Sequence, residues 1–213
     1  METSLHEQIE LTITVLGENT VEATVVPALE PLDELFAALH GGDNTSKRAE
    51  AEDLIWALWC SHEDVAARNS LNHAIGAISR GELDQAETLL DALVTSWPQW
   101  AEAWNKRATL YFLREQFLES VKDIKRTLEL EPRHFGALSG FGQICLHVGD
   151  EHSALIAFDF ALRANPTLNG VRNAADGLRS RLQPGLAPTE DWWVRFHVGG
   201  HSRKSNMIDI SGR

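Results

Sequence analysis

The sequence has few cysteines, few basic residues and no long apolar run. Cys60 and Cys145 are its only cysteines, which are too few for a disulfide framework and give no reason to assume an oxidising compartment. No segment approaches the roughly 18 apolar residues that a membrane-spanning helix needs, so we expect no membrane insertion. The first ten residues lack the basic and apolar regions of a secretory signal. We therefore expect a cytoplasmic protein, while an organellar or periplasmic location of a processed form stays open.

Sequence motifs of catalysis and metal binding are also missing. The chain has no GxSxG, Walker or GxGxxG motif. Neither of two histidine pairs, His147 with His152 and His197 with His201, forms the helical i, i+4 arrangement with an accompanying acid that marks a zinc site. We therefore predict a protein that is not an enzyme and that has no metal site and no cofactor.

Basic residues are scarce where acidic residues are dense. The formal net charge is −12, and residues 1–66 contain fourteen acidic residues against only Lys47 and Arg48. Such a chain lacks the basic surface that neutralises phosphates, so we expect no nucleic-acid partner. The acidic amino-terminal segment is either a solvated surface or a docking face for a basic partner.

What the sequence does contain is a repeat. Pro98, Pro132 and Pro166 lie 34 residues apart, a period typical of repeats built from two helices. With repeats at 67–100, 101–134 and 135–168, small residues recur where the two helices of a repeat would cross, and larger residues fill the space around them. The small residues are Ala74, Ala108 and Gly142 at position 8, and Ala86, Ser120 and Ala154 at position 20.

These repeats resemble tetratricopeptide-repeat (TPR) proteins. The stretch WAEAWNKRATLYFL…DIKRTLELEPRHFGALSGFG is similar in particular to a group of small, largely alphaproteobacterial TPR proteins. The resemblance implies an all-α helix-turn-helix solenoid that binds other proteins, and it supplies no catalytic residues. We therefore expect a non-enzymatic adaptor or assembly factor that holds a protein or peptide partner. The alternative is a structural subunit of a larger multiprotein complex.

The flanking segments complete the expected organisation. Residues 31–66 read as a degenerate repeat, a helix pair that caps the amino-terminal end of the solenoid, and residues 169–183 read as one capping helix. In residues 1–30, Ile9, Leu11, Ile13 and Val15 alternate with polar residues, which predicts a β-hairpin. Residues 184–213 read as a tail with short strands.

The concave groove of the solenoid would bind the partner. Its lining comes from the first helix of each repeat, where Asn105 and Gln143 can hydrogen-bond an extended peptide backbone. The alternative is that Leu71, Ile75, Ile78 and Phe112 pack beneath the amino-terminal helix pair and bind nothing. The candidate groove residues are Arg68, Leu71, Ile75, Glu102, Asn105, Thr109, Phe112, Ser139, Gln143 and Leu146.

Two further features concern the partner. TPR proteins that bind chaperone tails clamp a terminal carboxylate with Lys and Asn in the first repeat and with Lys and Arg in the third. This chain has Leu71, Ile75, Gly136 and Gly140 at those positions, which argues against a chaperone-tail receptor. Trp97 and Trp100 in one inter-repeat loop, and Trp192 with Trp193 in the tail, are either structural or exposed anchors for a partner.

Overall fold

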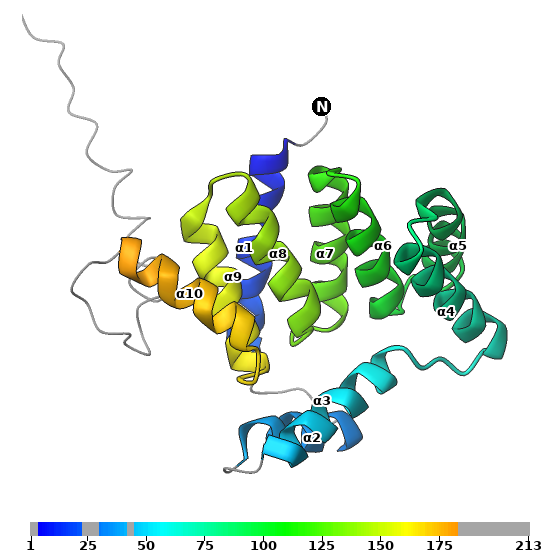
Figure 1. Ribbon diagram of the computed structural model, residues 1–213, viewed down its shortest axis with the longest axis horizontal. Coiled ribbons are helices and arrows are strands. Elements are labelled where there is room, and N and C mark those ends of the chain that lie inside the picture. Colours follow the sequence, from blue (N-terminus) through cyan, green and yellow to red (C-terminus); the bar gives the residue numbers. More distant parts are fainter. Residues whose placement is uncertain (1–3, 23–29, 42–44, 183–213) are drawn as a thin grey trace, which may run out of the picture.

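The computed structural model describes residues 4–22, 30–41 and 45–182, and within these ranges the chain forms ten helices and no strand. Six of them make three consecutive antiparallel pairs that stand side by side in a row (Figure 1). The pairs are α4 (Val65–Ser79) with α5 (Leu83–Ser96), α6 (Ala101–Leu113) with α7 (Phe117–Leu130), and α8 (Phe135–His147) with α9 (Glu151–Ala164). The predicted helical solenoid is confirmed.

The turn inside each pair places one residue in the left-handed region. In two pairs it is a glycine, Gly81 with φ 75° or Gly149 with φ 80°, and in the middle pair it is Glu115 with φ 58°. Glycine has no Cβ to clash in this conformation, which explains two of the three residues. Glu115 adopts it at a steric cost that the surrounding pair must offset.

Small residues lie where the helices of a pair cross. Ser120 Oγ donates a 2.8 Å hydrogen bond to the Ala108 carbonyl, so the backbones of α6 and α7 approach closely. In the third pair, a Cβ on Gly142 would lie 2.3 Å from Phe158 Cε1, and the Phe158 ring is fully buried. Gly142 therefore makes room for Phe158.

We expect alanine to act oppositely at two glycines of α8. Gly142→Ala should lower the free energy of unfolding by about 1–3 kcal/mol, because the buried Phe158 ring cannot move aside. Gly140→Ala should raise it by roughly 0.5–1 kcal/mol, because its Cβ would meet only Ile124 Cδ1, at 3.9 Å, and alanine favours the helix. Urea unfolding of both variants measures these changes. Equal changes in the free energy of unfolding would contradict the close contact between Gly142 and Phe158.

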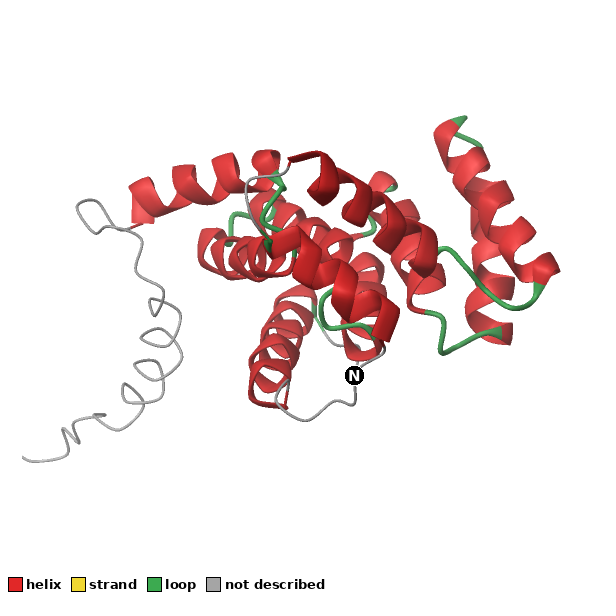
Figure 2. Ribbon diagram, turned by 90° about the horizontal axis from the view of Figure 1, so that it is seen from below, coloured by secondary structure: helices red, strands yellow, loops and turns green. Residues whose placement is uncertain are grey.

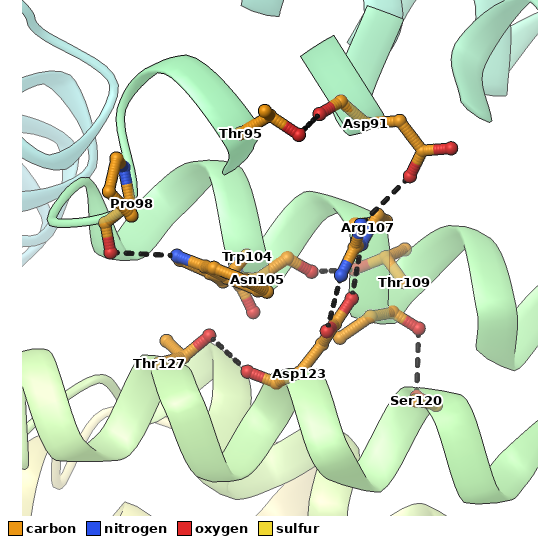
Figure 3. Close-up of polar contacts among 11 residues, drawn as sticks. Asp91, Thr95, Pro98, Trp104, Asn105, Arg107, Thr109, Ser120, Asp123 and Thr127 are labelled. Carbon is orange, nitrogen blue, oxygen red and sulfur yellow. Dashed lines mark hydrogen bonds and ion pairs between the residues drawn. The ribbon is translucent and has the colours of Figure 1, made fainter. Parts of the chain in front are cut away.

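Neighbouring pairs are joined by a polar network around Arg107 of α6 (Figure 3). Its guanidinium donates to both carboxylate oxygens of Asp123 on α7, at 2.7 and 2.9 Å, and to Asp91 on α5 at 2.8 Å. The same group packs over the rings of Trp104 and Tyr111. A single bidentate arginine thus connects three consecutive helices.

The amino-terminal segment is helical, so the predicted β-hairpin is wrong. Helix α1 (Leu5–Glu22) begins with a capping box, in which Ser4 and Glu7 bond each other's backbone amides. It packs on α7 and α9 and buries Ile9, Ile13 and Leu16, while Leu11 is 45% exposed. The buried residues therefore follow a helical period rather than a period of two.

Helices α2 (Glu30–His40) and α3 (Thr45–Trp59) form a pair, but this pair does not continue the row beside α4 as expected. It lies along the loops that join the repeats (Figures 1 and 2). Asp33 pairs with Arg133, Glu52 accepts from Thr167 at 2.7 Å, and His40 bonds the Arg163 carbonyl at 2.7 Å. The pair α2–α3 therefore contacts the carboxy-terminal ends of the second and third repeats.

Helix α10 (Asn169–Leu182) covers the carboxy-terminal end of the row of helix pairs. It packs on α9, buries Ala175 and Leu178, and pairs Arg179 with Asp159 and Arg181 with Glu151. The expected carboxy-terminal strands, together with Trp192 and Trp193, lie outside the described residues. None of the helices described here is long and apolar enough to cross a bilayer. The division of the chain into seven units stays a prediction.

Candidate functional site

A cleft of about 130 Å³ opens between α6, α7 and α8. Its walls are mostly apolar, with Ile124 and Ile144 among them, and Asn105, Thr109 and Gln143 contribute polar groups. None of the described residues that line it is charged. The complete lining is Asn105, Ala108, Thr109, Phe112, Ser120, Ile124, Gly136, Ala137, Gly140, Gln143 and Ile144. Such a lining suits an apolar group flanked by hydrogen-bonding groups.

Two glycines of α8 shape the cleft. At Gly140 an added Cβ would meet only Ile124 Cδ1, at 3.9 Å, so the missing side chain leaves open space. At Gly136 an added Cβ would lie 2.5 Å from Trp56 Cη2. The ring of Trp56, on α3, therefore stands against the backbone of α8 at one end of the cleft. The helix pair α2–α3 thus adjoins the cleft at this end.

A buried polar cluster adjoins this end of the cleft, with the Glu102 carboxylate at its centre. Glu102 is fully buried. Its Oε2 accepts from Asn105 Nδ2 and His134 Nε2, both at 2.9 Å, and its Oε1 pairs with Lys106 Nζ at 2.8 Å. The Cys60 thiol adds a long contact of 3.7 Å. This carboxylate is satisfied from four sides, and Asn105 connects it to the cleft.

The cluster determines the charge of Glu102. Burial alone would raise the pKa of this carboxyl, because a charge is poorly solvated inside a protein. The interactions with His134 and Lys106 outweigh burial and lower the pKa to about 2. Burial and the nearby Glu102 raise the pKa of the Cys60 thiol to about 11, so the thiol stays protonated.

This low pKa predicts a pH dependence of stability. A carboxyl whose pKa is lower in the folded than in the unfolded state stabilises the fold above its ordinary pKa of 4.5, and that contribution is lost as the pH falls towards 2. From pH 6 to pH 3 the wild type should therefore lose more free energy of unfolding than Glu102→Gln does. Urea unfolding at several pH values measures the difference. Glu115 is exposed, so the control variant Glu115→Gln should lose the same free energy of unfolding between pH 6 and pH 3 as the wild type.

Aromatic rings of α3 cover the cluster. Trp59 stacks on His134, with ring centroids 4.0 Å apart and planes at 12°. Trp56 meets His134 edge to face, and Lys106 Nζ lies 5.1 Å from the Trp56 ring centroid. His134 Nδ1 accepts a hydrogen bond from the backbone N–H of Ala137, so the ring proton is on Nε2. The Nε2–H group donates a hydrogen bond to Glu102 Oε2. The histidine joins α3, α6 and α8.

The structure brings only some of the candidate groove residues together. Asn105, Thr109, Phe112 and Gln143 line the cleft. Leu71 is fully buried in a separate core between α4, α5 and α6, and half-buried Ile75 packs against that core. Of the others, Glu102 is enclosed in its cluster, Arg68 is half-buried, Leu146 packs on the main core, and Ser139 bonds the Phe135 carbonyl. The alternative that the apolar groove residues pack beneath α2–α3 does not hold for Leu71, Ile75 and Ile78, which belong to the core of α4, α5 and α6.

Comparison with known proteins gives the family. No protein-family model matches the sequence. A TPR repeat-containing protein from Rhizobium etli is 30% identical over 151 residues, which cover 71% of this chain and 74% of that protein. The chain belongs to the TPR repeat-containing proteins.

Solved TPR structures share the fold. The first TPR of Spaghetti, bound to an HSP90 peptide, has a TM-score of 0.52 and 17% identity, over 55% of this chain and 92% of that chain. The Sgt2 TPR domain from Aspergillus fumigatus has a TM-score of 0.52 and 16% identity, over 60% and 89% of the two chains. At these identities the likeness concerns the TPR fold alone.

The TPR resemblance does not extend to a carboxylate clamp. At the four positions where chaperone-binding TPR proteins place basic and amide residues, Leu71 is buried and Ile75 is half-buried among apolar side chains. The remaining two, Gly136 and Gly140, line the cleft. Among the described residues, the two clamp positions that lie in the cleft are therefore glycines, where those clamps have basic side chains.

The sequence patterns missed three residues that shape the site, namely Trp56, Lys106 and His134. They come from α3, from α6 and from the residue that precedes α8, and they meet because α2–α3 packs against the loops that join the repeats. One available signal was the ionisable His134 directly before the apolar start of α8, where a side chain can accept the amide of the first turn.

Proposed function

We propose that this TPR protein is a non-enzymatic adaptor that binds an extended segment of a partner protein in the cleft between α6 and α8. The observation that carries the proposal is the neutral, mostly apolar cleft that opens above Gly140. Its volume of about 130 Å³ is close to that of an apolar cavity known to hold benzene, roughly 150 Å³. A leucine, methionine or phenylalanine side chain is of suitable size.

Polar groups at the cleft support a peptide as the occupant. The Asn105 amide nitrogen is committed to Glu102, which fixes the side chain and leaves its oxygen as the acceptor for a peptide N–H. Thr109 and Gln143 are exposed and contribute further hydrogen-bonding groups. The HSP90 peptide bound to the Spaghetti TPR supports a protein segment as the kind of ligand. The neutral lining favours an internal segment over a charged chain end.

The test is selection from a random peptide library with amidated ends, followed by calorimetric titration of the selected peptides. We expect peptides with one large apolar residue to bind the wild type. Gly140→Leu fills the open space and should weaken binding at least tenfold. The matched control Gly140→Ala adds only a methyl group and should keep the affinity within about twofold.

The same titration can contradict the proposal. Equal affinity of the wild type and Gly140→Leu would place the peptide elsewhere on the protein. The HSP90 peptide with its free carboxylate provides a second comparison. It should bind weakly or not at all, because the part of the chain that the structure describes places no cation in the cleft lining. Tight binding would contradict the preference for an internal segment.

A further inference from the structure

A second hollow, of about 260 Å³, lies where the segment after α3 crosses the loop between α5 and α6. Its walls are aromatic. The His62 ring lies 4.5 Å from the Trp97 ring and 4.7 Å from the Trp100 ring, with the planes inclined by 56° and 40°. The lining is His62, Ser96, Trp97, Pro98, Gln99 and Trp100. No residue of the α6–α8 cleft belongs to it.

Hydrogen bonds hold two of these rings in place. His62 Nδ1 accepts the backbone amide of Asp64 at 3.1 Å, so Nε2 carries the proton of the neutral ring. Trp100 is 8% exposed, and its indole N–H donates to the Trp59 carbonyl at 2.8 Å. Hydrogen bonds therefore fix the orientations of the His62 and Trp100 rings in the wall of the hollow.

Two aromatic N–H groups at the hollow are free to donate. Among the described residues, neither His62 Nε2–H nor the indole N–H of Trp97 has a hydrogen-bond acceptor. The nearby Pro98 carbonyl is already bonded to Trp104 Nε1, at 3.1 Å, and to Arg126, at 3.3 Å. A complementary ligand brings acceptors together with compact apolar groups.

We propose that this hollow binds an extended, proline-containing segment of a partner protein. Proline has no N–H to satisfy, and a polyproline II segment leaves its carbonyls free and presents its rings to aromatic walls. A lysine or arginine side chain also packs on aromatic faces, but it carries only donors. Such a side chain would leave the N–H donors of His62 and Trp97 without an acceptor, whereas the carbonyls of a proline-rich segment can accept from both.

Decaproline is the probe, titrated into the full-length protein labelled with nitrogen-15. Each of the seven tryptophans gives an indole N–H signal, and Trp97→Phe identifies that of Trp97. We expect decaproline to shift the Trp97 indole signal in a saturable manner. Trp97→Phe keeps an aromatic wall but removes the donor, so it should weaken binding about tenfold, the effect of losing one hydrogen bond. Because this variant has no Trp97 signal, its binding and that of the wild type are compared at the indole signal of Trp100, which also lines the hollow.

Two controls make the test decisive. Gly140→Leu alters the other cleft and should leave decaproline binding unchanged, which separates this proposal from the proposed function. A glycine–serine peptide of equal length and decalysine should leave the Trp97 signal in place. No shift with decaproline, or a larger saturable shift with decalysine, would overturn the proposal.

Discussion

Replacing His134 by alanine is expected to lower the free energy of unfolding by about 3–5 kcal/mol, because it leaves the buried Glu102 carboxylate short of one partner. His134 is fully buried, donates to Glu102, accepts the first-turn amide of α8 and stacks on Trp59. The substitution therefore removes a charge-assisted hydrogen bond, a helix cap and a ring contact together. Urea unfolding of both proteins measures the loss.

Two control variants separate these causes. His73 is exposed on α4, so His73→Ala should change stability by no more than about 0.5 kcal/mol. Introducing His134→Ala into Glu102→Gln should cost less than in the wild type, because no uncompensated charge remains. An equal cost in both backgrounds would mean that His134 contributes by packing alone.

Leu16→Ala in α1 is expected to cost about 2–5 kcal/mol, the usual effect of emptying a leucine site in a core. Leu16 is 1% exposed, whereas Leu11 on the same helix is 45% exposed. Leu11→Ala should therefore change stability little. Guanidinium unfolding of the two variants measures both effects.

This pair of variants also distinguishes the helix from the β-hairpin that alternation suggested. In a strand, Leu11 would share the buried face with Ile9 and Ile13, and Leu16 would point to the opposite face. A large loss for Leu11→Ala together with a small loss for Leu16→Ala would contradict the helix.

The amino-terminal error has a simple physical origin. Ile9 and Ile13 are four residues apart, a spacing that fits one face of a strand and one face of a helix equally well. Leu16 and the buried polar residues Gln8 and Thr12 favour the helix, but a polar residue is a weak sign of burial in a sequence. Packing of α1 on α7 and α9 decided the outcome.

The solenoid, by contrast, was predictable from the sequence. Its small residues recur at fixed positions because two helices of a repeat must cross closely, as the contact between Gly142 and Phe158 demonstrates. That constraint is local, since each pair lies within one 34-residue period. The steric requirement inside each helix pair therefore appears in the sequence as small residues at fixed positions of every repeat.

The place of α2–α3 was not predictable for the opposite reason. Its anchoring contacts join residues 100 and 115 positions apart, Asp33 with Arg133 and Glu52 with Thr167. No periodicity encodes such pairs. Glu102 was consequently taken for a groove residue, although the end of α3 encloses it. Four other residues that were predicted for the groove do line the cleft, namely Asn105, Thr109, Phe112 and Gln143.

The most direct test of the proposed binding site is to locate a selected peptide by intermolecular nuclear Overhauser effects. If the cleft between α6 and α8 is the site, protons of the peptide's apolar side chain should show contacts with the methyl groups of Ile124, Ile144 and Thr109, all of which line it. Contacts confined to exposed apolar residues outside the cleft, such as Leu54 and Leu58 of α3, would contradict the account.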